Sequence, residues 1–308
     1  MAALSAPPAE AAAPPPRWYT HRLNRPAVYR AGALLTGALP RPVRLALARV
    51  VARRAAEWFP AERARVRANL ARVRPAAGAA ERERLVNEVF RHFAVCFTDL
   101  ISTNRREARP ERLVARIEGD EHLLAADAER RGLVLVTAHL GNSELGGRLL
   151  AARLRRPTHV VVAAEVDPGV ERFLRGGPAP VRFVRRGDPT AAVPLVAALR
   201  RNEIVALQGD RALGTRGDML VDFFGEPAPF PLGPFMLARA AGAPVVPAFC
   251  LLERDRRYVV TIGRPIHVTS GGERAALGEW VGVLEATIRR APEQWFNFFD
   301  VWSAAPAS

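Results

Sequence analysis

One histidine and one glutamate stand five residues apart, directly after an apolar run, and both side-chain types can move protons. Residues 133–136 are all aliphatic, which predicts a strand covered on both faces. His139 follows the C-terminal end of this strand, the edge where open α/β sheets place ligands. On a single helix, residues five apart point about 140° away from each other. His139 and Glu144 can therefore meet only if the turn at Gly141 and Asn142 folds the chain back.

The two side chains suit general-base catalysis. A neutral imidazole takes a proton from a hydroxyl group, while a carboxylate holds its tautomer and stabilises the imidazolium. We expect His139 to be the base and Glu144 its orienting carboxylate. The local pattern equally fits a hydrogen-bonded structural histidine and a glutamate that favours a helix N-terminus. Zinc needs three or four ligands, and the sequence shows neither ligand-spaced histidines nor paired cysteines, so we expect no metal.

The segments around this turn predict an α/β fold. Strands and helices alternate after residue 116, which indicates a mainly parallel sheet with helices on both faces. The expected strands are 133–136, 159–163, 181–184 and 204–207, followed by short strands beginning near 221 and 243. The expected helices are 144–153, 168–175, 191–200 and 235–241.

The N-terminal third has a different character. Residues 1–16 are mostly alanine and proline and predict a disordered tail. Residues 17–110 predict a helical, membrane-associating region, with helices at 28–39, 43–59, 63–73 and 81–103; the α/β domain then covers 111–308. A membrane span needs about 20 apolar residues without interruption, which this region lacks. Its arginine-rich amphipathic pattern fits helices on an anionic membrane surface and, equally, helices packed on the domain.

The charge of the chain limits its partners. Net charge is +14, and all 45 strongly basic residues are arginines. Arginine binds phosphate and carboxylate with two parallel hydrogen bonds, so acidic lipids, nucleic acid and acidic carrier proteins are candidates. No zinc finger, RNA-binding strand or helix-turn-helix is evident, so we expect no nucleic acid. Cys96 and Cys250 stand alone, which argues against a disulfide-stapled secreted protein.

A second polar group follows the strand at 204–207, in the sequence Gln208-Gly-Asp210-Arg211. This block and several others resemble the bacterial lipid A biosynthesis acyltransferase family, within the wider glycerolipid acyltransferases. The resemblance covers roughly residues 20–302. The matching blocks are Arg67-Ala-Asn69-Leu, 90–100, His139 to Glu144, the Asp210 block, Phe223-Phe-Gly225, Gly233-Pro234, 242–247 and Pro292-Glu-Gln-Trp295-Phe.

The resemblance implies an O-acyltransferase with a glycerolipid-acyltransferase-like fold. Its acyl donor would be a thioester of acyl carrier protein or coenzyme A, its acceptor a hydroxyl of a lipid or glycolipid, and it would need no other cofactor. It implies a peripheral or monotopic place on the cytoplasmic face of the bacterial inner membrane. Ser143 stands where the family commonly has an aromatic residue. The acceptor therefore stays open between lipid A, other glycolipids, phosphatidylinositol mannosides, ornithine lipids and aryl polyene lipids.

Six further residues are expected to bind substrate in such an enzyme: Asn142, Arg185, Asp210, Arg211, Gly225 and Gly233. Arg211 is the candidate for stabilising negative charge on the reacting oxygen, with Asp210 fixing its direction. A local ion pair between the two is the alternative. Arg185 and Arg186 could bind phosphate. A thioesterase using the same histidine and a non-catalytic lipid- or nucleic-acid-binding protein are the competing functions.

Overall fold

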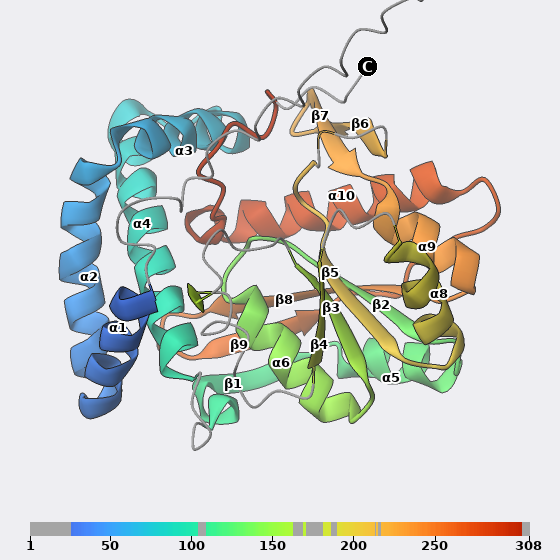
Figure 1. Ribbon diagram of the computed structural model, residues 1–308. Helices are drawn as coiled ribbons and strands as arrows, with labels where there is room; N and C mark the ends of the chain where they lie inside the picture. Colours follow the sequence, from blue (N-terminus) through green and yellow to red (C-terminus); the bar gives the residue numbers. More distant parts are fainter. Residues whose placement is uncertain are drawn as a thin grey trace, which may run out of the picture.

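A seven-stranded sheet forms the centre of the protein (Figure 1). The computed structural model describes residues 26–103, 109–162, 169–170, 181–185, 190–212, 214 and 217–303. The strand order is β1-β9-β8-β2-β5-β3-β4, and every neighbouring pair is parallel except β8 and β9. The strands are β1 (Val114–Glu118), β2 (Leu133–Thr137), β3 (Thr158–Val162), β4 (Val181–Arg185), β5 (Ile204–Gln208), β8 (Val245–Leu252) and β9 (Tyr258–Ile262). The prediction of a mainly parallel sheet is confirmed.

The sheet is covered on both faces, as the aliphatic run in β2 predicted. Leu133 and Leu135 belong to one buried cluster, whereas Val134 and Val136 belong to the other, because alternate side chains of a strand point to opposite faces. One face carries α5 (Asp120–Ala128) and α6 (Ser143–Leu154). The other carries α8 (Ala192–Arg200), α9 (Gly233–Ala241) and α10 (Glu273–Arg290) (Figure 1).

The N-terminal helices lie together at one end of the sheet (Figure 1). They are α1 (Pro26–Ala38), α2 (Arg41–Trp58), α3 (Pro60–Val73) and α4 (Ala79–Ser102), close to the four predicted segments. Buried residues of α2, α3 and α4, among them Leu45, Leu70 and Phe90, join the cluster beneath α5 and α6. Within the described residues, every helix is too short or too polar to cross a membrane.

Some elements were not predicted. They are β1, α5, β7 (Glu226–Pro231), β9 and α10, together with the short 3-10 helices η1 (Pro110–Leu113) and η2 (Pro292–Gln294). The strand expected near 221 is β6 (Asp218–Phe223), which forms an antiparallel hairpin with β7. The expected tail at 1–16, most of the expected helix at 168–175 and Arg186 lie outside the described residues.

Candidate active site

Two neighbouring strands bring His139 and Asp210 together. β2 and β5 pair in parallel, with Thr137 opposite Gln208. Two residues beyond this pair, the Nδ1 atom of His139 lies 2.8 Å from Oδ1 of Asp210. The backbone N–H of His139 also donates to Oδ2 of Asp210, at 3.0 Å. One carboxylate therefore holds both the backbone and the imidazole of the histidine.

The charge of Asp210 determines which imidazole nitrogen can act as a base. Burial alone would raise the pKa of this 1% exposed carboxyl group. The nearby charge of His139, its hydrogen bonds and the charge of Arg211 outweigh burial and lower the pKa to about 2. An ionised carboxylate can only accept, so the proton of the neutral imidazole is on Nδ1 and its lone pair is on Nε2. The side chain of His139 is 23% exposed, so a substrate can approach the ring.

Nδ1 of His139 therefore has Asp210 as its carboxylate partner, and the orienting role expected of Glu144 stays a prediction. The carboxylate of Asp210 is buried and bonded to His139, and its expected contact with substrate stays a prediction. Glu144 is exposed in the first turn of α6, on the chain that leaves the histidine. The N-terminus of a helix carries partial positive charge, which favours a carboxylate such as Glu144 in the first turn of α6.

Asn142 makes hydrogen bonds inside the protein, and its expected contact with substrate stays a prediction. Its side chain, 4% exposed, accepts from the backbone N–H of Leu145 and so caps α6. Its amide group donates to the backbone oxygen of Cys96 at 3.0 Å and to the hydroxyl of Tyr258 at 3.3 Å. The amide is thus used inside the protein, where it holds the turn that carries His139.

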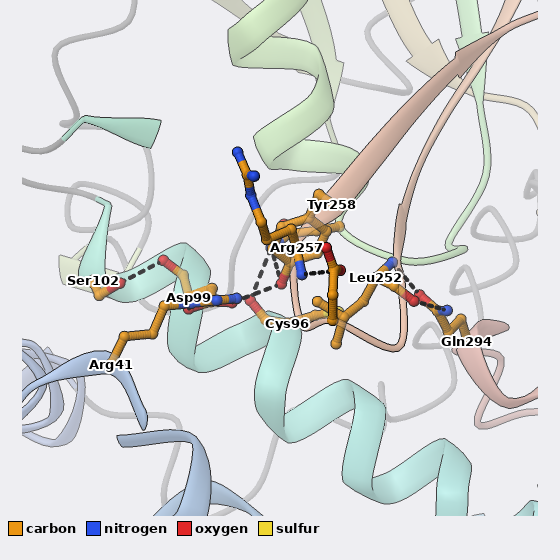
Figure 2. Close-up of polar contacts among 10 residues, drawn as sticks. Arg41, Cys96, Asp99, Ser102, Leu252, Arg257, Tyr258 and Gln294 are labelled. Carbon is orange, nitrogen blue, oxygen red and sulfur yellow. Dashed lines mark hydrogen bonds and ion pairs between the residues drawn. The ribbon is translucent and has the colours of Figure 1, made fainter. Parts of the chain in front are cut away.

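A buried polar cluster continues from this cap to the N-terminal helices (Figure 2). Burial raises the pKa of Tyr258 well above its ordinary value, so its hydroxyl stays protonated and donates to Asp99 at 3.0 Å. Arg41 donates twice to the same carboxylate, at 3.0 and 2.7 Å. Figure 2 shows Arg41 and Tyr258 converging on Asp99 from different elements. The turn that carries His139 is therefore bonded, through Asn142 and Tyr258, to α4 and α2.

The C-terminal segment holds the other side of the site. The N–H of Phe296 donates to the backbone oxygen of His139 at 2.7 Å. Asn297 donates from Nδ2 to Asp210 at 3.3 Å and accepts from Nε of Arg211 at 2.9 Å. Arg211 also donates to the backbone oxygen of Phe296 at 2.9 Å. Asn297 thus bridges Asp210 and Arg211, whose charges also interact directly.

Gln294, in the block Pro292-Glu-Gln-Trp295-Phe, anchors the same segment to β8. Its side chain exchanges two hydrogen bonds with the backbone of Leu252, at 2.8 and 2.9 Å (Figure 2). Its backbone oxygen accepts from Gly141 at 2.9 Å. Gly141 has φ of +62°, and an added Cβ would lie 2.2 Å from the backbone oxygen of Cys250, so only glycine fits this turn.

The structure does not gather all the expected residues. Arg185 ends β4, three strands from β2, or about 14 Å by strand spacing. Gly225 lies in the β6–β7 turn with φ of +84°, and Gly233 begins α9.

Four residues of the site were not predicted: Arg41, Asp99, Tyr258 and Asn297. Asp99 and Asn297 each place a polar side chain in an apolar stretch, a signal of a buried hydrogen-bonded group. Arg41 and Tyr258 carry no comparable signal, because their partners lie far away in the sequence. Within the part of the chain that is described, no three His, Cys, Asp or Glu side chains are arranged to hold a metal ion.

Comparison with known proteins places this site in context. A family model described as bacterial lipid A biosynthesis acyltransferase matches residues 22–303. A phosphatidylinositol mannoside acyltransferase of Mycobacterium tuberculosis (strain H37Rv) is 31% identical over 191 residues, which are 61% of this chain and 60% of the relative. The match thus spans less than two thirds of that relative's length.

Two relatives from Escherichia coli (strain K12) match over more of the chain. The lipid A biosynthesis lauroyltransferase is 28% identical over 286 residues, 90% of this chain and 86% of the relative. The lipid A biosynthesis palmitoleoyltransferase is 26% identical over 262 residues, 83% of this chain and 84% of the relative. His139, Asp210 and the C-terminal segment all lie within the region matched by the family model.

Proposed function

Because the chain belongs to the bacterial lipid A biosynthesis acyltransferase family, we propose that it transfers a fatty acyl group from a thioester to a hydroxyl of a lipid or glycolipid. The observation that carries this proposal is the 2.8 Å contact between His139 and the buried Asp210 at adjacent strand ends. This contact leaves the basic Nε2 on a partly exposed ring.

In the proposed reaction, Nε2 of His139 takes the proton of the acceptor hydroxyl as its oxygen attacks the thioester carbonyl carbon. The carbon–sulfur bond then breaks, and the imidazolium returns the proton to the leaving thiolate. Asp210 keeps the Nδ1 proton in place and stabilises the imidazolium. No nucleophilic side chain is required, because the acceptor brings its own hydroxyl group.

Two charged residues complete the proposal. Glu144, exposed in the first turn of α6, adds negative charge to the turn that carries His139. Arg211 provides positive charge toward the oxygen that becomes negative when the carbonyl is attacked. The contacts of Arg211 with Asn297 and Phe296 support this role, because they hold the guanidinium beside Asp210.

The test is thioester consumption, with mass spectrometry of the lipid products, for the wild type and His139→Ala. Acyl carrier protein and coenzyme A thioesters are each supplied with a membrane-lipid extract. We expect an added acyl mass on a lipid, lost in the variant. His267→Ala is the matched control, since His267 lies on the surface in contact with Glu129. Thioester loss without an acylated lipid indicates a hydrolase, and a reaction independent of His139 refutes the mechanism.

An acidic carrier protein would suit a chain with a net charge of +14. Attraction between opposite charges speeds the encounter and weakens as salt screens it. We propose that acyl carrier protein is a donor and expect its reaction to slow between low and physiological salt. Equal rates at both salt concentrations would exclude this electrostatic steering.

We also propose that the enzyme lies peripherally on the cytoplasmic face of the inner membrane. Apolar residues at helical spacing on α2 are exposed, among them Leu47, Val50 and Val51, whereas Leu45 and Ala52 are buried on its other face. Such a helix suits an anionic membrane surface.

Vesicle sedimentation tests this membrane proposal. Leu47→Glu combined with Val51→Glu should weaken binding to vesicles that contain phosphatidylglycerol. The control is Val193→Glu, because Val193 on α8 is 77% exposed but lies outside the N-terminal helices. Equal binding by the double variant and the control would exclude α2 as the membrane contact.

A further inference from the structure

A basic cavity lies between α2, α4 and the end of β8, apart from the His139 site. Its volume is about 290 Å³, and its walls are Arg49, Arg91, His92, Val95 and Leu252. This volume is close to the lower end of the range for small-molecule sites, about 300 Å³. The cavity therefore has room for a small charged group and its nearest substituents. Among these described lining residues, two are arginines, one is a histidine and none is a carboxylate.

The packing of α2 on α4 explains how the cavity becomes basic. Arg41 of α2 binds Asp99 of α4, and Arg49 lines the cavity with Arg91, so α2 and α4 run antiparallel. Eight residues take each helix through about two turns. At one position along this helix pair, Arg41 of α2 binds the carboxylate of Asp99 on α4. Two turns away, Arg49 lines the cavity beside Arg91 and His92.

The positive charge around the cavity is only partly balanced by carboxylates. Glu88 is paired with Arg91, and its backbone oxygen contacts Nδ1 of His92 at 3.1 Å. Among the described residues, no carboxylate lies within ion-pair distance of the Arg49 guanidinium. Burial lowers the pKa of Arg49, and the positive charges of Arg256 and Arg91 lower it further, against a raising effect of Glu88. The negative charge of Glu293 likewise acts on His92. An anion in the cavity would relieve the repulsion between the arginines.

We propose that this cavity binds the phosphate group of an anionic ligand. Arginine is suited to the task because its planar guanidinium binds two phosphate oxygens at once. Two sources share this chemistry: the headgroup of an anionic phospholipid, and a soluble compound such as coenzyme A. The proposal does not rest on acyl transfer, because it concerns binding at a separate place.

Isothermal titration with inorganic phosphate tests the site in the intact protein. Arg49→Gln removes the charge and keeps a long polar side chain. Arg54→Gln is the matched control: Arg54 lies on the same helix, is exposed and pairs with Glu57. We expect about tenfold weaker phosphate binding in Arg49→Gln, the loss of a charge-assisted contact, and wild-type binding in the control. Equal affinities in both variants, or no binding by the wild type, would overturn the proposal.

The source is then identified with two ligands, each tested on both variants. One is short-chain phosphatidylglycerol below its micelle-forming concentration, and the other is coenzyme A. Weaker binding of the lipid in Arg49→Gln alone assigns the cavity to a headgroup, and the same result with coenzyme A assigns it to a soluble phosphate. If neither ligand distinguishes Arg49→Gln from Arg54→Gln, the cavity is not a phosphate site for either source. Circular dichroism of each variant verifies that the helices are intact.

Discussion

Replacing Asp210 by asparagine keeps the shape of the side chain and removes its charge, so it isolates the electrostatic work of this carboxylate. At 2.8 Å, and with an effective dielectric constant of about 20, a carboxylate and an imidazolium attract by about 6 kcal/mol. The amide can also donate to Nδ1 and so favour the tautomer with its proton on Nε2, which cannot act as a base. Since 1.4 kcal/mol is tenfold in rate, we expect kcat to fall about 10³- to 10⁴-fold.

The assay is single-turnover acyl transfer, which measures the chemical step without product release. Asp255→Asn serves as the control, because Asp255 is an exposed carboxylate in the β8–β9 turn. Asp210 acts through the imidazole, so Asp210→Asn should have little further effect in a protein that already carries His139→Ala. A folded Asp210→Asn protein within tenfold of the wild-type rate would refute this reasoning. A large further loss in the His139→Ala background would show that Asp210 acts on substrate directly.

Three other predictions follow from the same contacts. Asn297→Ala should lower kcat about 10- to 100-fold and the free energy of unfolding by about 1–3 kcal/mol. The reason is that Asp210 and Arg211 each lose a hydrogen-bond partner. An unchanged kcat would contradict the bridging role. Gly147→Leu should reduce transfer of long acyl chains more than short ones, because Gly147 lines a narrow, mainly apolar cavity beneath α6. The control is Gly282→Leu on α10. Equal effects of Gly147→Leu on all chain lengths would exclude an acyl site in this cavity. The lowered pKa of Asp210 contributes about 2 kcal/mol of stability that is present above about pH 4 and lost as pH falls toward 2. In urea unfolding, the free energy of unfolding should therefore fall less between these pH values in Asp210→Asn than in the wild type. An equal fall in both proteins would exclude this contribution.

The residues at the strand ends were predictable, but their pairing was not. Aliphatic runs placed His139 and Asp210 each just beyond a strand. The sequence does not show that β2 and β5 are neighbours, because β3 and β4 lie between them along the chain. Without that adjacency, Glu144 was the nearest carboxylate by sequence and received the orienting role. The sheet order adds Asp210 as a partner of His139, since parallel pairing in register brings positions 139 and 210 side by side.

The C-terminal support of the site was also only partly visible in the sequence. The block from Pro292 was singled out by resemblance, and in the structure Gln294 of this block bonds to Gly141, in the turn that follows His139. Asn297 lies between aromatic residues, where a helix or strand pattern gives no reason for an amide. Its importance comes from three segments that meet only in the folded chain: the end of β5, the turn after β2 and the C-terminus.

Hydrogen bonds connect the N-terminal helices to the turn that carries His139, and they determine how membrane association must be tested. Asp99 is fully buried and accepts two hydrogen bonds from Arg41 on α2. A truncation that removes α2 would leave this charge without its cation, at a cost of about 3–5 kcal/mol. The loss would reach Tyr258 and then Asn142, which caps α6 beside His139. A truncated enzyme would thus lose activity whether or not α2 contacts a membrane. Substitutions on the outer face of α2 leave the Arg41–Asp99 pair in place, so they separate membrane contact from support of the active site.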